Sequence, residues 1–386
     1  MRKALVLLLL GFLAAIVIWS FIFIFLPKEE RIASPREYVL VPTWGTGNLV
    51  IIDPYKNSII ATIPTGLLAH TLTITPPDAR YVIVVNSGSN TVTMIDLYEL
   101  KSIKDFNLEP FPNGITISSD GKYAAVTNYL GNSVSIIDVS KREIIKTIIV
   151  GKKPRGIKFV NEDKNILVSV SEENSVKVID ASTWAVIKTI PTAPKPRGIY
   201  LSPNKRYAFV GNQEKNVNNI TVIDAKELKG IANVTVGFGP NWIIVTPDSN
   251  YAYVTNADSN TVSVIDLKTM KVVKTILVKE RPRTGDVTPD GKYVIICNMW
   301  GNSVSIIDTS TMEVIKTLEV GAGPRMGTVV KIASGMFSYV VNTEEDSISV
   351  IDLSSLKVVT TISLTKGSVP GGAFNFYSMA FGGEQT

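Results

Sequence analysis

The 386-residue sequence contains one cysteine, Cys297, and one histidine, His70. A single cysteine excludes an intramolecular disulfide, and the lack of a Cys-x-x-Cys-His motif excludes a covalently attached c-type heme. A single histidine excludes a multi-histidine copper cluster. Cys297 lies within the apolar run YVIICN and is interpreted as a small buried hydrophobe. These shortages exclude several metal and redox classes before any motif is considered.

Concentrated positive charge is also missing. The sequence has no run of five or more Lys or Arg residues, and its net charge of +5 is spread along the chain. We therefore expect no nucleic-acid partner. Hydrophobic residues make up 45% of the sequence, so a chain of this length buries a sizeable core.

The N-terminal segment is strongly apolar. Ala4–Leu26 carries no charge and follows Arg2 and Lys3. About 20 apolar residues span a bilayer as a helix, and no small-residue cleavage site follows. We therefore expect an uncleaved transmembrane signal anchor over residues 1–27, followed by a linker over 28–37. The basic residues should stay in the cytoplasm and the remainder should lie outside the cell. The alternative is a long signal peptide that is removed.

The remainder is repetitive. An Ile-Asp pair recurs along the chain and ends one apolar run of each unit. Upstream of most copies of this pair, a second apolar run ends in asparagine, as in YAYVTN at Asn256. Runs such as RGIYLSPNK and KVVKTILV complete each unit. Each run is short, rich in Val, Ile, Tyr and Thr, and bounded by turn sequences such as TPDGK, which indicates four short antiparallel strands per unit. The pairs recur every 42 to 44 residues, at Asp53, Asp96, Asp138, Asp180, Asp224, Asp266, Asp308 and Asp352.

A four-stranded repeat of this length predicts an all-β fold, a propeller over residues 38–378 with a C-terminal tail over 379–386. The chain enters its first unit at the second strand, Glu37–Pro42, so that unit lacks an inner strand. Val369–Phe376 matches the missing strand through its Pro-x-Gly start. We expect this segment to join the first unit and close the ring. The count gives eight blades; seven is the alternative, if one unit pairs irregularly.

These motifs also carry a family resemblance. YAYVTN, followed by NTVSVIDL, and TPDGKY resemble the YVTN-type β-propeller repeats of archaeal surface-layer and bacterial extracytoplasmic proteins. The resemblance covers residues 38–378 and implies a secreted or surface binding scaffold. It extends more loosely to the propeller domains of nitrous oxide reductase, heme d1 nitrite reductase and lactonase-type enzymes. The fold alone does not choose among these functions.

One position in the repeat varies in an informative way. The sequence PRGI occurs at Pro154–Ile157 and again at Pro196–Ile199. Proline and glycine shape the turn into the innermost strand, where chains crowd, so the residue between them should lie at the mouth of the central channel. The last copy has Gly371 there. The other copies hold four arginines, two asparagines and a histidine, with no acid: His70, Asn113, Arg155, Arg197, Asn241, Arg283 and Arg325.

Converging arginines favour an anionic ligand, because guanidinium groups bind carboxylate and phosphate through two hydrogen bonds. Loops on the same face carry Trp44, Tyr129 and Trp300, which we expect to form an aromatic rim. Such a mouth suits an acidic sugar, a polyanionic glycan or an acidic peptide. The alternative is that the arginines are solvated or pair with loop acids such as Glu173 and Asp258.

No catalytic arrangement emerges from the sequence. A lactonase-type metal site needs several converging acids, but Asp286 is the only clear acid on an inner strand, and heme d1 would find His70 as its sole imidazole. We therefore expect no enzyme, no metal site and no cofactor. The favoured function is a membrane-anchored extracytoplasmic scaffold that binds a small anion, a glycan or an envelope protein. The alternatives are a lactonase- or reductase-like enzyme or redox accessory using the basic mouth, and a structural surface-layer subunit.

Overall fold

The computed structural model describes residues 38–212, 216–371 and 374–375. The chain divides into two units, 1–36 and 37–386, and the fold below is that of the second. The expected signal anchor, linker and C-terminal tail lie outside the described residues. Among the residues that are described, none forms a helix both long and apolar enough to cross a membrane.

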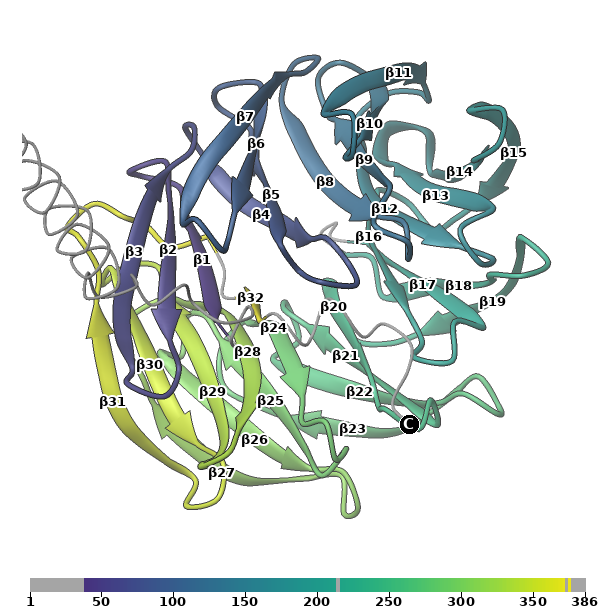
Figure 1. The fold of residues 1–386 in the computed structure, drawn as a ribbon. Coiled ribbons are helices and arrows are strands. Elements are labelled where there is room, and N and C mark those ends of the chain that lie inside the picture. The colour runs from purple at the N-terminus through teal and green to yellow at the C-terminus, as the bar shows by residue number, and fades with distance from the viewer. Residues whose placement is uncertain (1–37, 213–215, 372–373, 376–386) are drawn as a thin grey trace, which may run out of the picture. The chain divides into compact units, whose positions relative to one another are not determined.

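The unit is an eight-bladed propeller of four-stranded antiparallel sheets (Figure 1). This confirms the all-β fold and the count of eight blades, and excludes seven. From the inner to the outer strand, blade 1 is β32 (Phe374–Asn375), β1 (Val39–Thr43), β2 (Asn48–Asp53) and β3 (Ser58–Pro64). Blade 2 is β4 (Ala69–Ile74), β5 (Tyr81–Asn86), β6 (Thr91–Asp96) and β7 (Lys101–Asn107). Blade 3 is β8 (Pro112–Ile117), β9 (Tyr123–Asn128), β10 (Ser133–Asp138) and β11 (Glu143–Ile149). Blade 4 is β12 (Pro154–Val160), β13 (Asn165–Val170), β14 (Ser175–Asp180) and β15 (Ala185–Pro191).

The other four blades repeat this order. Blade 5 is β16 (Pro196–Leu201), β17 (Tyr207–Asn212), β18 (Asn219–Asp224) and β19 (Lys229–Thr235). Blade 6 is β20 (Pro240–Val245), β21 (Tyr251–Asn256), β22 (Thr261–Asp266) and β23 (Lys271–Leu277). Blade 7 is β24 (Pro282–Val287), β25 (Tyr293–Asn298), β26 (Ser303–Asp308) and β27 (Glu313–Glu319). Blade 8 is β28 (Pro324–Ile332), β29 (Gly335–Asn342), β30 (Ser347–Asp352) and β31 (Lys357–Ser363).

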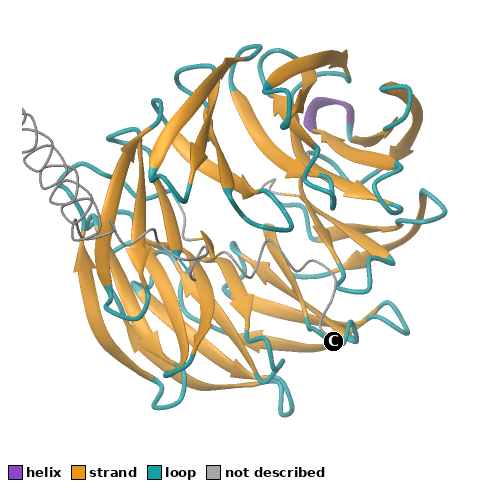
Figure 2. Ribbon diagram, viewed as in Figure 1, coloured by secondary structure: helices purple, strands orange, loops and turns teal. Residues whose placement is uncertain are grey.

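Burial follows the position of a strand within its blade. The two middle strands are almost wholly buried, because neighbouring blades cover both of their faces. The outer strands are mostly exposed to solvent, and in β11 only Ile148 is buried. Figure 2 shows that strands and short loops make up nearly the whole unit. The core is therefore a series of apolar layers between adjacent blades.

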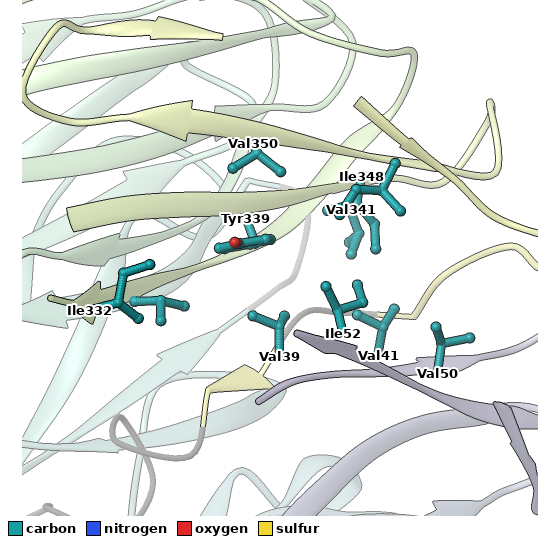
Figure 3. Close-up of a cluster of buried hydrophobic side chains, with 11 residues drawn as sticks. Val39, Val41, Val50, Ile52, Ile332, Tyr339, Val341, Ile348 and Val350 are labelled. Carbon is teal, nitrogen blue, oxygen red and sulfur yellow. The ribbon is translucent and has the colours of Figure 1, made fainter. Parts of the chain in front are cut away.

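The first and last blades meet through such a layer. Val39, Val41, Val50 and Ile52 pack against apolar side chains of β28–β30, among them Tyr339 (Figure 3). The Tyr339 hydroxyl donates to the Pro54 carbonyl at 3.2 Å. On the inner side, β32 pairs with β1, and the Gly371 N–H donates to the Pro42 carbonyl at 2.8 Å.

The repeated polar residues serve the blades. In blade 4, Asp180 Oδ1 accepts the N–H groups of Ser182 and Thr183, both at 2.9 Å, which caps the turn to the outer strand. The side-chain amide of Asn128 donates to Ser133 and Ser135 on the next strand, both at 2.9 Å. Such contacts recur around the ring, so they account for the conserved spacing of the repeat. The positions at which the repeat varies are therefore the candidates for a functional site.

Candidate functional site at the centre of the ring

The variable residues of the inner strands form one cluster. Each is the second residue of its strand, and adjacent inner strands pack against one another around the ring. Positive charges reach across this cluster: Arg325 and Arg197 both act on the pKa of His70, and Arg283 and Arg197 act on that of Arg325. The structure thus brings the predicted residues together. We name them the mouth cluster: His70, Asn113, Arg155, Arg197, Asn241, Arg283 and Arg325.

Hydroxyl groups of the preceding blade hold the backbone of every arginine in the cluster. Ser169 Oγ donates to the Arg197 carbonyl at 2.6 Å and accepts the Gly156 N–H at 2.8 Å. The bonds to the other carbonyls are Thr127 to Arg155 at 2.8 Å, Thr255 to Arg283 at 3.1 Å and Thr284 to Arg325 at 2.6 Å. Since each bond joins two blades, the arginines are fixed to the ring as a whole.

The glycines of the Pro-x-Gly motif are required by close approach between blades. A Cβ atom on Gly114 would lie 2.2 Å from the Arg155 carbonyl oxygen, and one on Gly156 would lie 2.5 Å from that of Arg197. No side chain fits at these distances. The interpretation that these positions need glycine because the chains crowd together at the centre is therefore confirmed for these copies.

The guanidinium groups of the mouth cluster are charged and partly removed from solvent. Burial, together with the charges of Arg155 and Arg283, lowers the pKa of Arg197 to about 10. Burial lowers the pKa of Arg325 to about 9, with Arg283 and Arg197 adding to the effect. Both groups are still protonated at pH 7, so the cluster stores electrostatic repulsion that a bound anion would relieve.

The basic residues of the surrounding loops differ from the mouth cluster in having acidic partners. On the loops, Glu172 bridges Lys153 and Lys195 at 3.2 and 2.9 Å, and Arg281 pairs with Asp258 at 3.1 Å. Within the described residues, no carboxylate forms a salt bridge with an arginine of the mouth cluster. Pairing with loop acids thus applies to the loops and leaves the cluster cationic.

Aromatic faces support several of these cations. The guanidinium carbon of Arg325 lies 3.9 Å from the Trp44 ring centre, and that of Arg155 lies 4.4 Å from Tyr129. Trp300 instead contacts Arg281, which lies in the loop before β24. The guanidinium carbon of Arg281 is 4.3 Å from the Trp300 ring centre. Two of the three predicted rim aromatics therefore contact the mouth cluster directly, and the third contacts its border.

Sequence reasoning missed two aromatic residues of the site. Tyr200 and Trp242 pack edge to face, 4.9 Å between ring centres, and the Tyr200 hydroxyl donates to the Asn241 carbonyl at 3.1 Å. Trp242 occupies the place that glycine has in three earlier copies. That departure from the repeat was the signal that marked it.

His70 lies beside Trp44, with the two rings edge to face and 6.0 Å between their centres. Its Nδ1 is 3.2 Å from the Leu68 carbonyl and 3.2 Å from Ser87 Oγ. The pKa of His70 is lowered to about 4, chiefly by burial and also by the charges of Arg325 and Arg197. The hydrogen bond to the Leu68 carbonyl acts in the opposite direction and raises it. The imidazole is therefore neutral at pH 7 and able to ligate a metal.

A metal held by protein side chains alone finds no set of ligands in the part of the chain that is described. No three His, Cys, Asp or Glu side chains there are grouped to hold an ion. Asp286, the acid noted on an inner strand, accepts the N–H groups of Val287 and Val329 at 2.8 and 2.9 Å. Its carboxylate is therefore engaged by the backbone.

Comparison with known proteins identifies a family. The family model described as the cytochrome D1 heme domain matches residues 34–148 and 213–373. No curated protein matches the chain. Solved structures do match: a dihydro-heme d1 dehydrogenase, NirN, in complex with DHE is 20% identical, with a TM-score of 0.78, over 92% of this chain and 78% of its own.

Two further structures share the fold. Apo AztD from Citrobacter koseri is 15% identical, with a TM-score of 0.68, over 88% of this chain and 98% of its own. Kuenenia stuttgartiensis hydrazine synthase is 22% identical, with a TM-score of 0.59, over 74% and 95%. At these identities the structures show the fold alone. They support a propeller without supporting the YVTN-type family in particular.

The family match contradicts the expectation that the chain is not an enzyme. It points, together with the fold shared with NirN, to an enzyme-like or heme-related propeller. The error has a physical cause. The sequence argument treated His70 as too few ligands for a heme, whereas a heme brings its own four equatorial nitrogens and needs one imidazole from the protein.

Proposed function

Because the chain belongs to the cytochrome D1 heme domain family, we propose that its mouth cluster binds a carboxylate-bearing tetrapyrrole of the heme d1 type and that the protein takes part in a redox step on it. One observation carries this proposal: a neutral imidazole, His70, lies among arginines that have no acidic partner in the described residues. The reductase-like alternative is thereby favoured over the surface scaffold.

The donor set fits such a ligand. Tetrapyrrole carboxylates match guanidinium groups in charge and shape, and the mouth cluster offers four of these. The indole N–H of Trp44, beside His70, is buried and has no hydrogen-bond partner among the described residues. When bound, the heme would supply one-electron chemistry at its iron. The chain would supply one nitrogen ligand, His70, and the positive charge.

The environment of His70 prepares it to act as that ligand. We assign the ring proton to Nδ1, which lies 3.2 Å from the Leu68 carbonyl, so that the lone pair is on Nε2; the Asn113 carbonyl also acts on the ring. Contact with Trp44 limits rotation of the ring. The arginines serve a different purpose, since they orient the tetrapyrrole by its carboxylates and fix its charge. The two contributions are separable by experiment.

Localisation enters as a further part of the proposal. Residues 4–26 would anchor the chain in a membrane, with the propeller outside the cytoplasm.

The test uses hemin and metal-free protoporphyrin IX as probes for the purified full chain. Both carry carboxylates, but only hemin carries iron. We expect the parent to bind both, followed by Soret absorbance and by quenching of tryptophan fluorescence. His70→Ala should lose the spectral signature of imidazole ligation with hemin and keep its affinity for protoporphyrin IX.

Arginine variants complete the design. Arg197→Gln combined with Arg283→Gln should weaken both probes by about 100-fold or more, since each of the two lost hydrogen bonds to a charged group contributes about 1.5–3 kcal/mol. Arg281→Gln removes a neighbouring charge that Asp258 already pairs, and should change affinity less than twofold. Equal losses in the two arginine variants, or unchanged hemin spectra in His70→Ala, would refute the proposal.

A further inference from the structure

The outer edge of blade 5 departs from the pattern of most other blades. Five outer strands have an exposed lysine as their fourth residue: Lys104, Lys146, Lys188, Lys274 and Lys316. In β3, β19 and β31 another residue stands there, and in β19 it is Ala232, next to Ile231, which is 45% exposed. A lysine on an edge strand discourages pairing with a strand of another molecule, because its charge would have to be buried. The edge of blade 5 lacks this protection.

The same strand carries a glycosylation sequence. Asn233-Val234-Thr235 has the form Asn-x-Ser/Thr, which is the acceptor for N-linked glycans in secreted proteins. Asn233 and Thr235 are exposed, whereas Val234 between them is buried. Because β19 is the outermost strand of its sheet, one of its edges faces away from the blade. Both residues that define the sequence are therefore accessible.

The hydrogen bonds of Asn233 leave its amide nitrogen to solvent. The Thr221 hydroxyl accepts the Ala193 N–H at 3.0 Å and donates to Asn233 Oδ1 at 2.8 Å. In blade 2 the matching hydroxyl, that of Thr93, bonds to Asp105 at 2.7 Å, and an ionised carboxylate only accepts, so the hydroxyl is the donor at this position. Within the described residues, Asn233 Nδ2 forms no hydrogen bond. This nitrogen is the atom to which a glycan is attached.

We propose that Asn233 carries an N-linked glycan, which covers the edge of β19 where the lysine is missing. Its donor is an oligosaccharide joined through its anomeric carbon to a polyisoprenyl phosphate. A bond forms between Asn233 Nδ2 and that carbon, and the bond from the carbon to the phosphate oxygen breaks. The lipid phosphate leaves with the electron pair and takes up the proton that the amide loses. The modification adds a bulky, solubilising group to an exposed position.

This inference rests on the proposed location of the propeller outside the cytoplasm, because the transferring enzyme and its lipid-linked donor act there. It does not rest on heme binding. The strand that carries Asn233 is the outermost of its blade, whereas the mouth cluster belongs to the innermost strands. The two proposals can therefore fail separately.

A second sequence of the same form provides the matched control. Asn219-Ile220-Thr221 begins β18, a middle strand of blade 5. Asn219 is half-buried, Thr221 is 3% exposed, and the Asn219 carbonyl accepts the side-chain amide of Asn212 at 2.8 Å. A glycan on Asn219 would have to emerge between packed strands. We therefore expect modification of Asn233 alone.

The direct test is peptide mass spectrometry of the full chain, purified from membranes of the organism that encodes it. We expect a glycan mass on the peptide containing Asn233 and none on Asn219. Thr235→Val, which removes the hydroxyl and keeps the shape of the side chain, should lose the glycan, and Asn219→Gln should keep it. An unmodified Asn233, or a glycan that persists in Thr235→Val, would overturn the proposal. Protease added to intact cells reports on the location of the propeller, and hemin titration of the same preparation reports on the mouth cluster.

A second experiment tests the protective role of the glycan. Aggregation of the full chain on heating is followed by light scattering in the parent, in Asn233→Gln, and in Asn233→Gln combined with Ala232→Lys. We expect Asn233→Gln to aggregate at a lower temperature than the parent. The added lysine should restore the temperature of the parent, because it supplies the charge that β15 and β23 have at this position. Equal aggregation temperatures in the three proteins would contradict a protective role for the glycan.

Discussion

Replacing Ser169 by alanine tests whether inter-blade hydroxyls hold the mouth arginines. Ser169 is fully buried in β13 and uses its hydroxyl twice, as acceptor from the Gly156 N–H and as donor to the Arg197 carbonyl. Alanine removes both bonds and leaves little room for water to replace them. One N–H and one carbonyl would then be buried without partners.

The size of the effect follows from those two groups. Each unsatisfied backbone group costs about 1–3 kcal/mol, so we expect Ser169→Ala to lower the free energy of unfolding by about 2–6 kcal/mol. A propeller of roughly 340 residues unfolds with an entropy of about 0.7 kcal/mol/K. The midpoint of thermal unfolding should therefore fall by about 3–9 °C. Hemin should also bind more weakly, because the Arg197 backbone loses its fixed position.

The assay compares the full chain with Ser169→Ala and Ser182→Ala by calorimetry and by hemin titration. Ser182 also bonds through its hydroxyl, to Asp180 at 2.6 Å, but in an exposed turn where water replaces the bond. We expect a change below about 0.5 kcal/mol for that control. If the two variants unfold within 1 °C of one another, the hydroxyl does not hold the ring and the reasoning about the other three arginines fails with it.

Two more predictions concern the inner strands. Burial raises the pKa of Asp286 to about 6, so its protonated form stabilises the fold below pH 4 and that stability is lost as the pH rises through 6. The loss is about 3 kcal/mol, and thermal melts at pH 4 and 7.5 should show it in the parent and not in Asp286→Asn; equal pH dependence would contradict it. Gly114→Ala should destabilise by about 1–3 kcal/mol in urea unfolding through its clash with Arg155, whereas Gly230→Ala, whose Cβ meets its nearest atom at 3.6 Å, should stay near neutral; similar values would refute the crowding argument.

The fold could be predicted because each blade repeats the same local instructions. Alternating apolar residues, the Asp turn and the Pro-x-Gly start recur at one spacing, so errors in one copy are corrected by the others. The same register placed His70 and Arg155 at the centre before any coordinates. What escaped were contacts between blades, such as the Tyr200 hydroxyl on Asn241 and the Ser169 hydroxyl on Arg197, which join residues 41 and 28 positions apart. No local sequence pattern specifies which residues so far apart in the chain will be in contact.

Function was harder to predict, and the reason lies in the architecture. A propeller assembles its centre from one residue per inner strand, about 42 positions apart, so a site formed there leaves no contiguous motif in the sequence. The absence of a motif therefore says little about catalysis in this fold. A residue at the variable position carries more information when it departs from the others. His70 is the only imidazole in the chain, and it occupies that position in a ring of arginines. A site with a single imidazole suits a ligand that supplies most of its own chemistry, which is what the match to a heme domain implies.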